Sequence, residues 1–321
     1  MDNKNKILCL TPIDHIRGVR DILHNVGMVH YCPDLSYEEA KKVINEFGPE
    51  IVFVNPNKMR FKLDAELLKN IDTVCTASTG LNHIDVEYCQ KNNKKVISLT
   101  TDYDVIEKIS STAEMAFSLM LSLIRNIPSA FEAAKRHEWN YEPFIGRQLN
   151  HLTAGVVGYG RLGKMFAHYC KSFGMDVVVY DPYKSIPGIY KSVSYAELLS
   201  LSDVISLHVH ITNETKGMIN AEALSQIKKE GAYLINTARG DIVNEKDVIA
   251  AIEQGHLIGY ATDVVRDELS DIEKSELIRA SDRLNIIVTP HIAGMTREAQ
   301  EIAYCSVAGR LLDYYGSGKN E

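Results

Sequence analysis

The chain has 321 residues, of which 45% are hydrophobic and 24% are charged, and it carries a formal net charge of −7. This length and composition predict a soluble globular protein of two domains with ample material for a core. The negative charge, without any long Lys/Arg block, argues against a surface that binds nucleic acid or an anionic membrane.

The sequence indicates a cytoplasmic protein without a metal site. The N-terminus passes directly into a strand-like run at Ile7, so no signal peptide is expected, and the apolar run over 115–124 is too short to span a bilayer. The six cysteines are scattered, without a Cys-x-x-Cys pair or a His-rich partner segment. They are expected to be reduced and buried, and neither zinc ligands nor disulfides are predicted.

Short apolar runs alternate with amphipathic stretches over the first hundred residues, which predicts a parallel sheet with helices on its faces. No glycine fingerprint follows the first run, so this doubly wound domain need not hold a nucleotide. The predicted strands are 7–10, 29–32, 51–54, 73–77 and 96–99, and the predicted helices are 16–26, 37–47, 65–68 and 84–91.

A long helix changes this pattern: it is predicted from Ser111 to Ile124, stops before Pro128, and is followed by a second helix over 129–137. The alternation then resumes with six strands, which are enough for a complete dinucleotide-binding sheet. The predicted strands are 153–157, 177–180, 204–207, 232–236, 258–262 and 286–289, with helices over 195–199, 221–227 and 246–254. The tail over 296–315 is typical of one amphipathic helix that returns to the N-terminal domain.

The six residues from Gly158 to Gly163 read Gly-Tyr-Gly-Arg-Leu-Gly, at the point where a predicted strand becomes a helix. In this context Gly158 permits a tight turn, Gly160 lets a pyrophosphate approach the backbone, and Gly163 lets the helix pack closely on the strand. The N–H groups of the first helical turn then face the phosphates, and Arg161 and Leu162 are expected to contribute backbone contacts. Such glycines alone also occur at turns that serve only close packing.

Asp181 ends the next β-branched run, 18 positions after Gly163. At the tip of that strand a carboxylate accepts hydrogen bonds from both hydroxyls of the adenosine ribose and repels a 2′-phosphate. The pattern therefore favours NAD over NADP. The alternative is that Asp181 only starts the turn Asp181-Pro182-Tyr183.

Three further strand ends carry polar residues at the edge where open α/β sheets bind ligands. Arg239 follows one predicted strand, Asp263 and Glu268 follow the next, and His291 stands at the exit of the last. Each has a simpler explanation when taken alone, namely a surface charge, a helix cap or a turn. The whole set is what indicates a reactive site.

These motifs resemble those of the NAD-dependent D-isomer-specific 2-hydroxyacid dehydrogenases. The resemblance implies an α/β fold in which a Rossmann NAD-binding domain, residues 102–295, is inserted into a flavodoxin-like substrate domain, residues 1–101 and 296–321, with the nicotinamide in the cleft between them. Weaker matches at Ala113-Glu114 and over 78–85 extend it across nearly the whole chain. The motifs are the fingerprint with Asp181, Ser206-Leu207-His208-Val209 with Thr215, Asn236-Thr237-Ala238-Arg239-Gly240, Asp263 with Glu268, and Thr289-Pro290-His291-Ile292-Ala293-Gly294.

The resemblance also implies roles for the strand-end residues. Arg239 is expected to clamp the substrate carboxylate and polarise the 2-oxo group, for which a planar, permanently charged guanidinium is suited. His291 is expected to be the general acid and base, and Glu268 to hold the imidazole and raise its pKa. Asp263 is expected to contact the nicotinamide carboxamide. The other cofactor-binding residues that it implies are Gly158, Gly160, Arg161, Leu162, Gly163, Asp181, His208, Val209, Thr215, Thr237, Ala238 and Gly294.

The loop after the fourth predicted strand is expected to present Ser78, Thr79 and Gly80 to the substrate carboxylate, although a glycine-bearing turn also serves simply to begin a helix. The loop over 55–60 lacks the Arg-Ser pair of phosphoglycerate-oxidising relatives, which leaves Lys58 or Arg60 as the candidate contact to a phosphate or second carboxylate, against the commoner outcome of a solvated charge. Leu269 and His210 stand where the family commonly has proline. These departures leave the geometry of the active-site rim open.

The sequence thus predicts an NAD-dependent D-2-hydroxyacid dehydrogenase that acts on a small 2-hydroxy or 2-oxo acid and, like its family, forms a homodimer through the nucleotide domain. The nearest alternative is 3-phosphoglycerate dehydrogenase, and no C-terminal regulatory domain is expected because the chain ends soon after the last helix. An alternative of another class is an NAD(H)-sensing scaffold similar to corepressor proteins, against which the lack of an interaction tail counts. The sequence names neither the acid nor the preferred direction.

Overall fold

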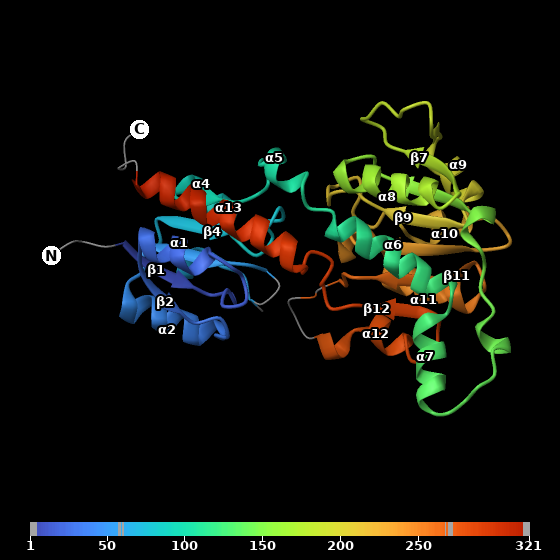
Figure 1. Ribbon diagram of the computed structural model, residues 1–321, viewed down its shortest axis with the longest axis horizontal. Coiled ribbons are helices and arrows are strands. Elements are labelled where there is room, and N and C mark those ends of the chain that lie inside the picture. The colour runs from blue at the N-terminus through green and yellow to red at the C-terminus, as the bar shows by residue number, and fades with distance from the viewer. Residues whose placement is uncertain (1–4, 57–58, 60, 267, 269–271, 317–321) are drawn as a thin grey trace. The chain divides into compact units, whose positions relative to one another are not determined.

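The computed structural model describes residues 5–56, 59, 61–266, 268 and 272–316 (Figure 1). The chain divides into two compact units, one formed by Met1–Ile109 with Gly294–Glu321 and the other by Ser110–Ala293. The second unit is therefore a continuous segment that interrupts the first. Within the described ranges, no helix has an apolar stretch of the length that crossing a bilayer requires.

The first unit is built on a parallel sheet with the strand order β2-β1-β3-β4-β5, the order of flavodoxin-like folds. Successive residues of β1 point to opposite faces, and both faces are buried, because helices cover each side of a parallel sheet. Ile7 and Cys9 lie in one core with α1 and α13, and Leu8 lies in the other with α2 and α3. The strands are β1 Asn5–Cys9, β2 Gly27–Tyr31, β3 Ile51–Val54, β4 Thr73–Thr76 and β5 Lys95–Ile97; the helices are α1 Val19–Val26, α2 Tyr37–Phe47, α3 Ala65–Leu68, α4 Val86–Lys91, α5 Tyr103–Ile106 and α13 Arg297–Gly316.

The last helix, α13, belongs to this first unit although it follows the second unit in the chain. It packs along α1, as Figure 1 shows for the red and blue helices. Tyr304 of α13 packs on Phe53 of β3 with ring centroids 5.9 Å apart, and its hydroxyl lies 3.2 Å from Thr11 Oγ1. The buried face of α13 thus completes the core of a sheet formed by the first hundred residues.

The second unit is built on a longer parallel sheet with the order β12-β11-β10-β9-β6-β7-β8. Counted from β6 as the first strand, this is the 3-2-1-4-5-6 order of dinucleotide-binding folds with one more strand at the end. The strands are β6 Thr153–Val157, β7 Asp176–Tyr180, β8 Lys191–Ser192, β9 Val204–Leu207, β10 Ala232–Asn236, β11 Leu257–Thr262 and β12 Ile286–Val288; the helices are α6 Ser111–Ile124, α7 Ile127–Lys135, α8 Arg161–Ser172, α9 Tyr195–Leu201, α10 Ala221–Ser225, α11 Glu245–Glu253 and α12 Glu276–Ala280, with 3-10 turns η1 Glu142–Phe144, η2 Leu149–His151, η3 Gly240–Ile242 and η4 Ile272–Lys274.

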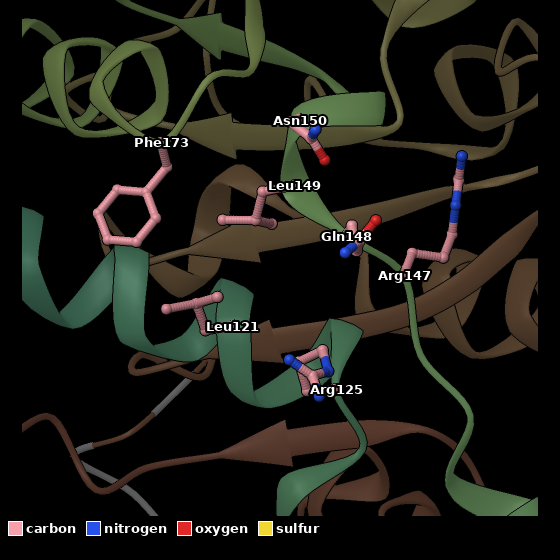
Figure 2. A pocket seen from close by; sticks show the side chains of 7 residues that line it. All are labelled: Leu121, Arg125, Arg147, Gln148, Leu149, Asn150 and Phe173. Carbon is pink, nitrogen blue, oxygen red and sulfur yellow. The ribbon is translucent and has the colours of Figure 1, made fainter.

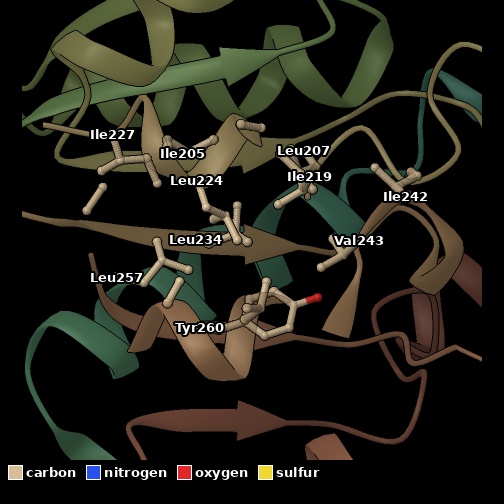
Figure 3. Close-up of a cluster of buried hydrophobic side chains, with 14 of the residues drawn as sticks. Ile205, Leu207, Ile219, Leu224, Ile227, Leu234, Ile242, Val243, Leu257 and Tyr260 are labelled. Atoms are coloured by element: carbon tan, nitrogen blue, oxygen red, sulfur yellow. The ribbon is translucent and has the colours of Figure 1, made fainter. Parts of the chain in front are cut away.

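Two apolar cores hold the second sheet between its helices. One contains α6 and α8. The other contains α9, α10, α11 and α12, and Figure 3 shows the side chains of Leu234 and Leu257 meeting those of the helices there, beside the fully buried ring of Tyr260. Because both faces are covered, the strands at the centre of this sheet are largely buried.

The predicted fold class, with two doubly wound parallel-sheet domains, is confirmed, and every predicted strand and helix is present near its predicted position. The count of six strands in the second sheet is wrong, because β8 adds a short edge strand that pairs with Val178 and Val179 of β7. Its residues, Lys191 and Ser192, are polar and exposed, so no apolar run marked them. The short helices α5 and α12 were also absent from the prediction.

The turn between β6 and α8 depends on two glycines. Gly158 has φ +93°, a left-handed conformation that side chains rarely adopt, and its N–H donates to the Tyr180 carbonyl over 2.8 Å. One turn into α8, a Cβ on Gly163 would lie 1.9 Å from the Gly158 carbonyl oxygen. The helix therefore approaches the strand end as closely as a backbone without side chains permits.

We expect Gly163→Ala to lower the free energy of unfolding by about 3 kcal/mol, because the new methyl group meets a backbone carbonyl that cannot move without opening the β6–α8 turn. Gly160→Ala is the matched control, since no atom lies within 4 Å of a Cβ there. Urea unfolding followed by circular dichroism measures both variants. Equal stability of the two alanine variants would show that the close approach at Gly163 does not matter.

Candidate active site

The predicted site residues of the second unit gather at one edge of its sheet. Gly158 follows β6, Asp181 follows β7, His208 follows β9, Asp263 follows β11, and the segment carrying His291 follows β12. All these strands are parallel, so their carboxyl ends share an edge. The chain order reverses between β6 and β9, and ligands of open α/β sheets bind at such a point.

The glycine turn has the shape of a phosphate cradle. Gly160, the N-cap of α8, has open space where a side chain would be, so a ligand can reach its backbone. The first bond within α8 runs from the Lys164 N–H to the Gly160 carbonyl over 3.0 Å, which leaves the usual outward N–H groups in the turn before it. A Cβ on Gly158 would lie 2.7 Å from the His208 carbonyl and 2.8 Å from Val209 Cγ1, so these two predicted cofactor residues border the turn.

The Asp181 carboxylate lies against the same turn. Its Oδ2 accepts a hydrogen bond from the Tyr159 N–H at 2.7 Å, and its Oδ1 accepts one from the Tyr183 N–H at 2.8 Å. The second bond is the local turn that was the alternative interpretation of Asp181. Both explanations are compatible, because each carboxylate oxygen accepts two hydrogen bonds and one acceptor position on each remains for a ribose hydroxyl. The residues of this turn therefore fit a dinucleotide.

His208 is half-buried beside the glycine turn. Its Nε2 lies 2.9 Å from Ser206 Oγ, and its ring packs on Phe166 with centroids 5.0 Å apart. Burial lowers the pKa of His208 to about 3, from an ordinary value of 6.5. The ring is therefore neutral near pH 7 and adds no positive charge to the site.

The loop after His208 is held by Thr215. Its hydroxyl donates to the His210 carbonyl over 2.6 Å and accepts the Thr212 N–H at 2.8 Å. The side chain predicted to bind cofactor thus also closes its own loop, with His210 in the position where the family commonly has proline. Leu269, the other departure, lies outside the described residues, as do Lys58 and Arg60.

Arg239 stands in a turn directly after β10, and its side chain is half-buried. Its Nη1 donates to the Ala238 carbonyl over 2.6 Å, and among the described residues it has no ion-pair partner within 4.0 Å. Burial lowers the pKa of the guanidinium, and the nearby Glu268 carboxylate acts in the opposite direction. A guanidinium stays protonated under such conditions, so this turn holds a positive charge with hydrogen-bond donors to spare.

Gly240 brings the Arg239 turn against the segment that leads to Glu268. A Cβ on Gly240 would lie 2.2 Å from the Val265 carbonyl carbon and 2.4 Å from the Arg266 nitrogen. Only a glycine permits two backbones to approach so closely. The contact explains why the Glu268 carboxylate acts on the pKa of Arg239.

His291 and Glu268 form a direct pair. His291 Nδ1 lies 3.0 Å from each carboxylate oxygen of Glu268, and both side chains are largely buried. His291 has φ +54°, a left-handed conformation uncommon outside glycine. The structure thus brings together Arg239, Glu268 and His291, which the sequence placed after three different strands.

Asp263 orders the segment that carries His291. Its Oδ1 accepts the Thr289 hydroxyl at 2.5 Å and the Ile292 N–H at 2.9 Å, and its Oδ2 accepts the Ala293 N–H at 2.7 Å. Its own carbonyl accepts the His291 N–H at 3.0 Å. The side chain is only 1% exposed. This anchoring of the loop is a function of Asp263 that sequence reasoning missed, and the predicted contact to the nicotinamide stays a prediction.

Four of the predicted residues belong to the first unit. Ser78, Thr79 and Gly80 follow β4, and the Gly80 N–H donates to Ser78 Oγ over 3.1 Å while the Thr79 carbonyl accepts the Thr100 hydroxyl at 3.0 Å. Gly294 is the first residue of the segment that rejoins this unit. The local bonds give the loop over 78–80 a fixed shape, and its contact with a substrate stays a prediction.

A cavity of about 300 Å³ lies at the opposite edge of the second sheet, where residues 148–150 lead into β6 (Figure 2). None of its lining residues belongs to the predicted site. They are Leu121, Arg125, Arg147, Gln148, Leu149, Asn150 and Phe173.

The strand order of the second unit, its glycine turn and the carboxylate at the end of β7 define a dinucleotide-binding α/β protein. The family model described as "D-isomer specific 2-hydroxyacid dehydrogenase, NAD binding domain" matches residues 117–293, more than half of the chain. The chain therefore belongs to the D-isomer specific 2-hydroxyacid dehydrogenase family, and NAD is the cofactor of its second unit. The family and the cofactor predicted from the sequence motifs are confirmed.

Named relatives agree with this assignment. D-3-phosphoglycerate dehydrogenase of Archaeoglobus fulgidus is 36% identical over 304 residues, which cover 92% of this chain and 54% of the relative. The enzyme of the same name from Bacillus subtilis is 34% identical over 251 residues, covering 77% and 46%. The chain thus spans about half the length of these relatives. The crystal structure of D-lactate dehydrogenase from Aquifex aeolicus with NAD and lactic acid is 30% identical, has a TM-score of 0.80, and is matched over 98% of this chain and 96% of its own.

The lowered pKa of His208 makes the stability of the fold depend on pH. The unfolded chain binds a proton at this ring near pH 6.5, whereas the folded chain does so only near pH 3, so acid favours unfolding as the pH falls through 6.5. Between pH 7 and pH 5 we expect wild type to lose about 2 kcal/mol more free energy of unfolding than His208→Gln. Urea unfolding at both pH values measures this, and parallel pH profiles for the two proteins would contradict it.

Proposed function

We propose that the protein is an NAD(H)-linked oxidoreductase that interconverts a D-2-hydroxy acid and its 2-oxo acid. The observation that carries the proposal is the His291–Glu268 pair beside the half-buried guanidinium of Arg239, at the carboxyl edge of an NAD-binding sheet. A proton-transfer group next to a cation that has no carboxylate in contact among the described residues suits a substrate whose carboxylate neighbours the reacting carbon.

His291 acts as the general acid and base through Nε2. Its Nδ1 faces the Glu268 carboxylate, which accepts hydrogen bonds only, so the neutral ring carries its proton on Nδ1 and leaves Nε2 as the acceptor. In oxidation, Nε2 takes the proton of the substrate hydroxyl as the carbonyl forms. In reduction, the same atom returns it to the carbonyl oxygen. The hydride exchanged at that carbon, with its two electrons, would go to or come from bound NAD.

Arg239 holds the substrate carboxylate. Its Nη1 is bonded to Ala238, so the remaining donors of the guanidinium are available to carboxylate and carbonyl oxygens. Glu268 keeps the imidazole oriented and balances the charge of Arg239. We assign the loop over Ser78, Thr79 and Gly80 to the substrate as well, and Thr237, Ala238, Asp263 and Gly294 to the cofactor side of the site, together with the residues of the glycine turn, Asp181, His208, Val209 and Thr215.

The second candidate reaction is the oxidation of 3-phosphoglycerate, which the names of the relatives favour. Both candidates use the same reacting groups, because each substrate is a 2-hydroxy acid. They differ in the group attached at C3. A panel of acids that includes a phosphorylated one therefore separates them.

The proposal predicts NADH oxidation with at least one acid among pyruvate, glyoxylate, 2-oxoisocaproate and 3-phosphohydroxypyruvate. His291→Ala should lower kcat by about 100-fold or more, because no other described group is placed to move the proton, and leave the Kd of NADH unchanged. Absorbance at the NADH band measures turnover, and NADH fluorescence measures binding.

His256→Ala is the control, because it removes an exposed histidine that has no place in the site. Full activity of His291→Ala would refute the assignment of the general acid. Tight NADH binding without turnover of any acid would instead favour the scaffold that senses NAD(H).

We also propose that the protein acts in the cytoplasm. All six cysteines are free thiols, which is typical of a reducing compartment. Burial raises the pKa of Cys75 and of Cys170 well above the ordinary value, so these thiols stay protonated and unreactive.

We further propose a homodimer formed through the second unit. Single exposed apolar side chains are common on protein surfaces, but a run of them in one segment is typical of a protein contact. Trp139 is 91% exposed. Phe173 is also exposed, and its side chain lines the cavity of Figure 2. The exposed set is Ile127, Phe131, Trp139, Tyr141, Ile145 and Phe173.

Light scattering after size-exclusion chromatography should give twice the chain mass for wild type and the chain mass for the double variant Trp139→Lys/Ile145→Lys, because two buried charges oppose association. Ile189→Lys, which also charges an exposed apolar position of the second unit, should remain dimeric. A monomeric wild type, or dissociation of the control to the same extent as the double variant, would refute the proposed dimer surface.

A further inference from the structure

We infer that Asn236 is a positioning residue for Arg239, and this inference rests on the proposed function. Asn236 is the last residue of β10 and is 0% exposed. Its Oδ1 accepts the Ala238 N–H at 3.0 Å, and its Nδ2 donates to the Arg239 carbonyl over 2.9 Å. The side-chain amide of Asn236 thus binds two backbone groups of the turn that carries the guanidinium.

The two bonds bracket a single peptide group. The Ala238 N–H belongs to the peptide group before this one, and the Arg239 carbonyl belongs to the peptide group after it. The peptide between them carries the Ala238 carbonyl, to which Arg239 Nη1 donates over 2.6 Å. The direction of the guanidinium therefore depends on a carbonyl whose orientation Asn236 sets from both sides.

The chemistry of the position requires an amide. The turn offers Asn236 one donor and one acceptor, and among short side chains only asparagine presents an acceptor and a donor side by side. Aspartate accepts the Ala238 N–H but has no donor for the Arg239 carbonyl. An apolar side chain leaves both backbone groups without these partners, in a place where water is largely excluded.

Asn236 is itself fixed by the neighbouring strand. Its backbone carbonyl accepts the Thr262 hydroxyl at 3.1 Å and the Asp263 N–H at 3.0 Å. Asp263 anchors the segment of His291, as described above. A continuous set of hydrogen bonds therefore links the cation at the end of β10 to the imidazole after β12, and Asn236 is the member that acts on the cation.

Tyr260 supplies a matched control within the same buried group. Its ring lies in the apolar core of Figure 3, and its hydroxyl accepts from Asn236 Nδ2 at 3.4 Å, a longer contact than either bond to the turn. Tyr260→Phe removes this contact and leaves both bonds to the turn. It therefore disturbs the core next to Asn236 without releasing Arg239.

The test compares steady-state kinetics on the preferred 2-oxo acid with NADH binding. Asn236→Ala should raise KM for the acid by about tenfold or more, while kcat changes less than KM and the Kd of NADH stays within about threefold, because the glycine turn and Asp181 lie on other strands. Tyr260→Phe should keep the wild-type KM. In an Arg239→Lys background the effect of Asn236→Ala on KM should fall below about twofold, since Asn236 acts through Arg239.

Asn236→Asp carries the same expectation of a raised KM and replaces Asn236→Ala if that variant does not fold. An unchanged KM in the folded Asn236 variant, or an equal rise of KM in Tyr260→Phe, would overturn the inference. So would an undiminished effect of Asn236→Ala in the Arg239→Lys background.

Calorimetric binding of oxamate to the NADH complex separates this inference from the proposed function, because oxamate resembles a 2-oxo acid and is not reduced. If wild type turns over no acid but binds oxamate, and Asn236→Ala does not bind it, the proposed function fails and the positioning role stands. If wild type is active and Asn236→Ala keeps its KM and its oxamate affinity, the positioning role fails and the proposed function stands.

Discussion

The site of the second unit depends on one buried carboxylate. Asp263 gathers a hydroxyl and two N–H groups from the segment after β12, and its backbone binds the N–H of His291. These bonds turn the end of the last strand back toward β10 and β11, so that the imidazole reaches Glu268. Without them the segment has only solvent to satisfy its N–H groups, and the groups proposed to react lose their common location.

Among the described residues of the site, one charge has no opposite charge in contact with it. Glu268 pairs with His291, and Asp263 accepts three hydrogen bonds from neutral donors of the backbone and Thr289. Arg239 alone keeps a desolvated positive charge without a carboxylate in contact among the described residues. A site of this kind selects an anion before any contact to the rest of the substrate is made, because a half-buried cation gains most from a partner that neutralises it.

Much of this was predictable from the sequence, because it follows from local rules. The glycine spacing from Gly158 to Gly163 and the carboxylate of Asp181 depend only on the order strand, turn, helix and strand. Arg239 and His291 were found as polar residues at strand ends. The contacts between strands were not predictable in this way: the three donors of Asp263 and the approach of Gly240 to Val265 depend on how far neighbouring strands are shifted along one another. Hydrophobic periodicity shows which face of a strand is buried and does not fix that shift. Strand β8 was not predicted because its two residues are polar and pair with β7 through the backbone alone, so the sequence shows no hydrophobic pattern there.

The left-handed backbone of His291 has a consequence for how such a protein changes over generations. A residue chosen for its imidazole occupies a conformation that glycine or asparagine adopts more readily, so the fold is less stable by about 1 kcal/mol for the sake of that side chain. Under the proposed function, selection for proton transfer is then the force that retains histidine there. In a lineage that keeps the NAD-binding fold but no longer needs the reaction, drift and stability act in the same direction at this position, and the histidine is among the first residues to be lost.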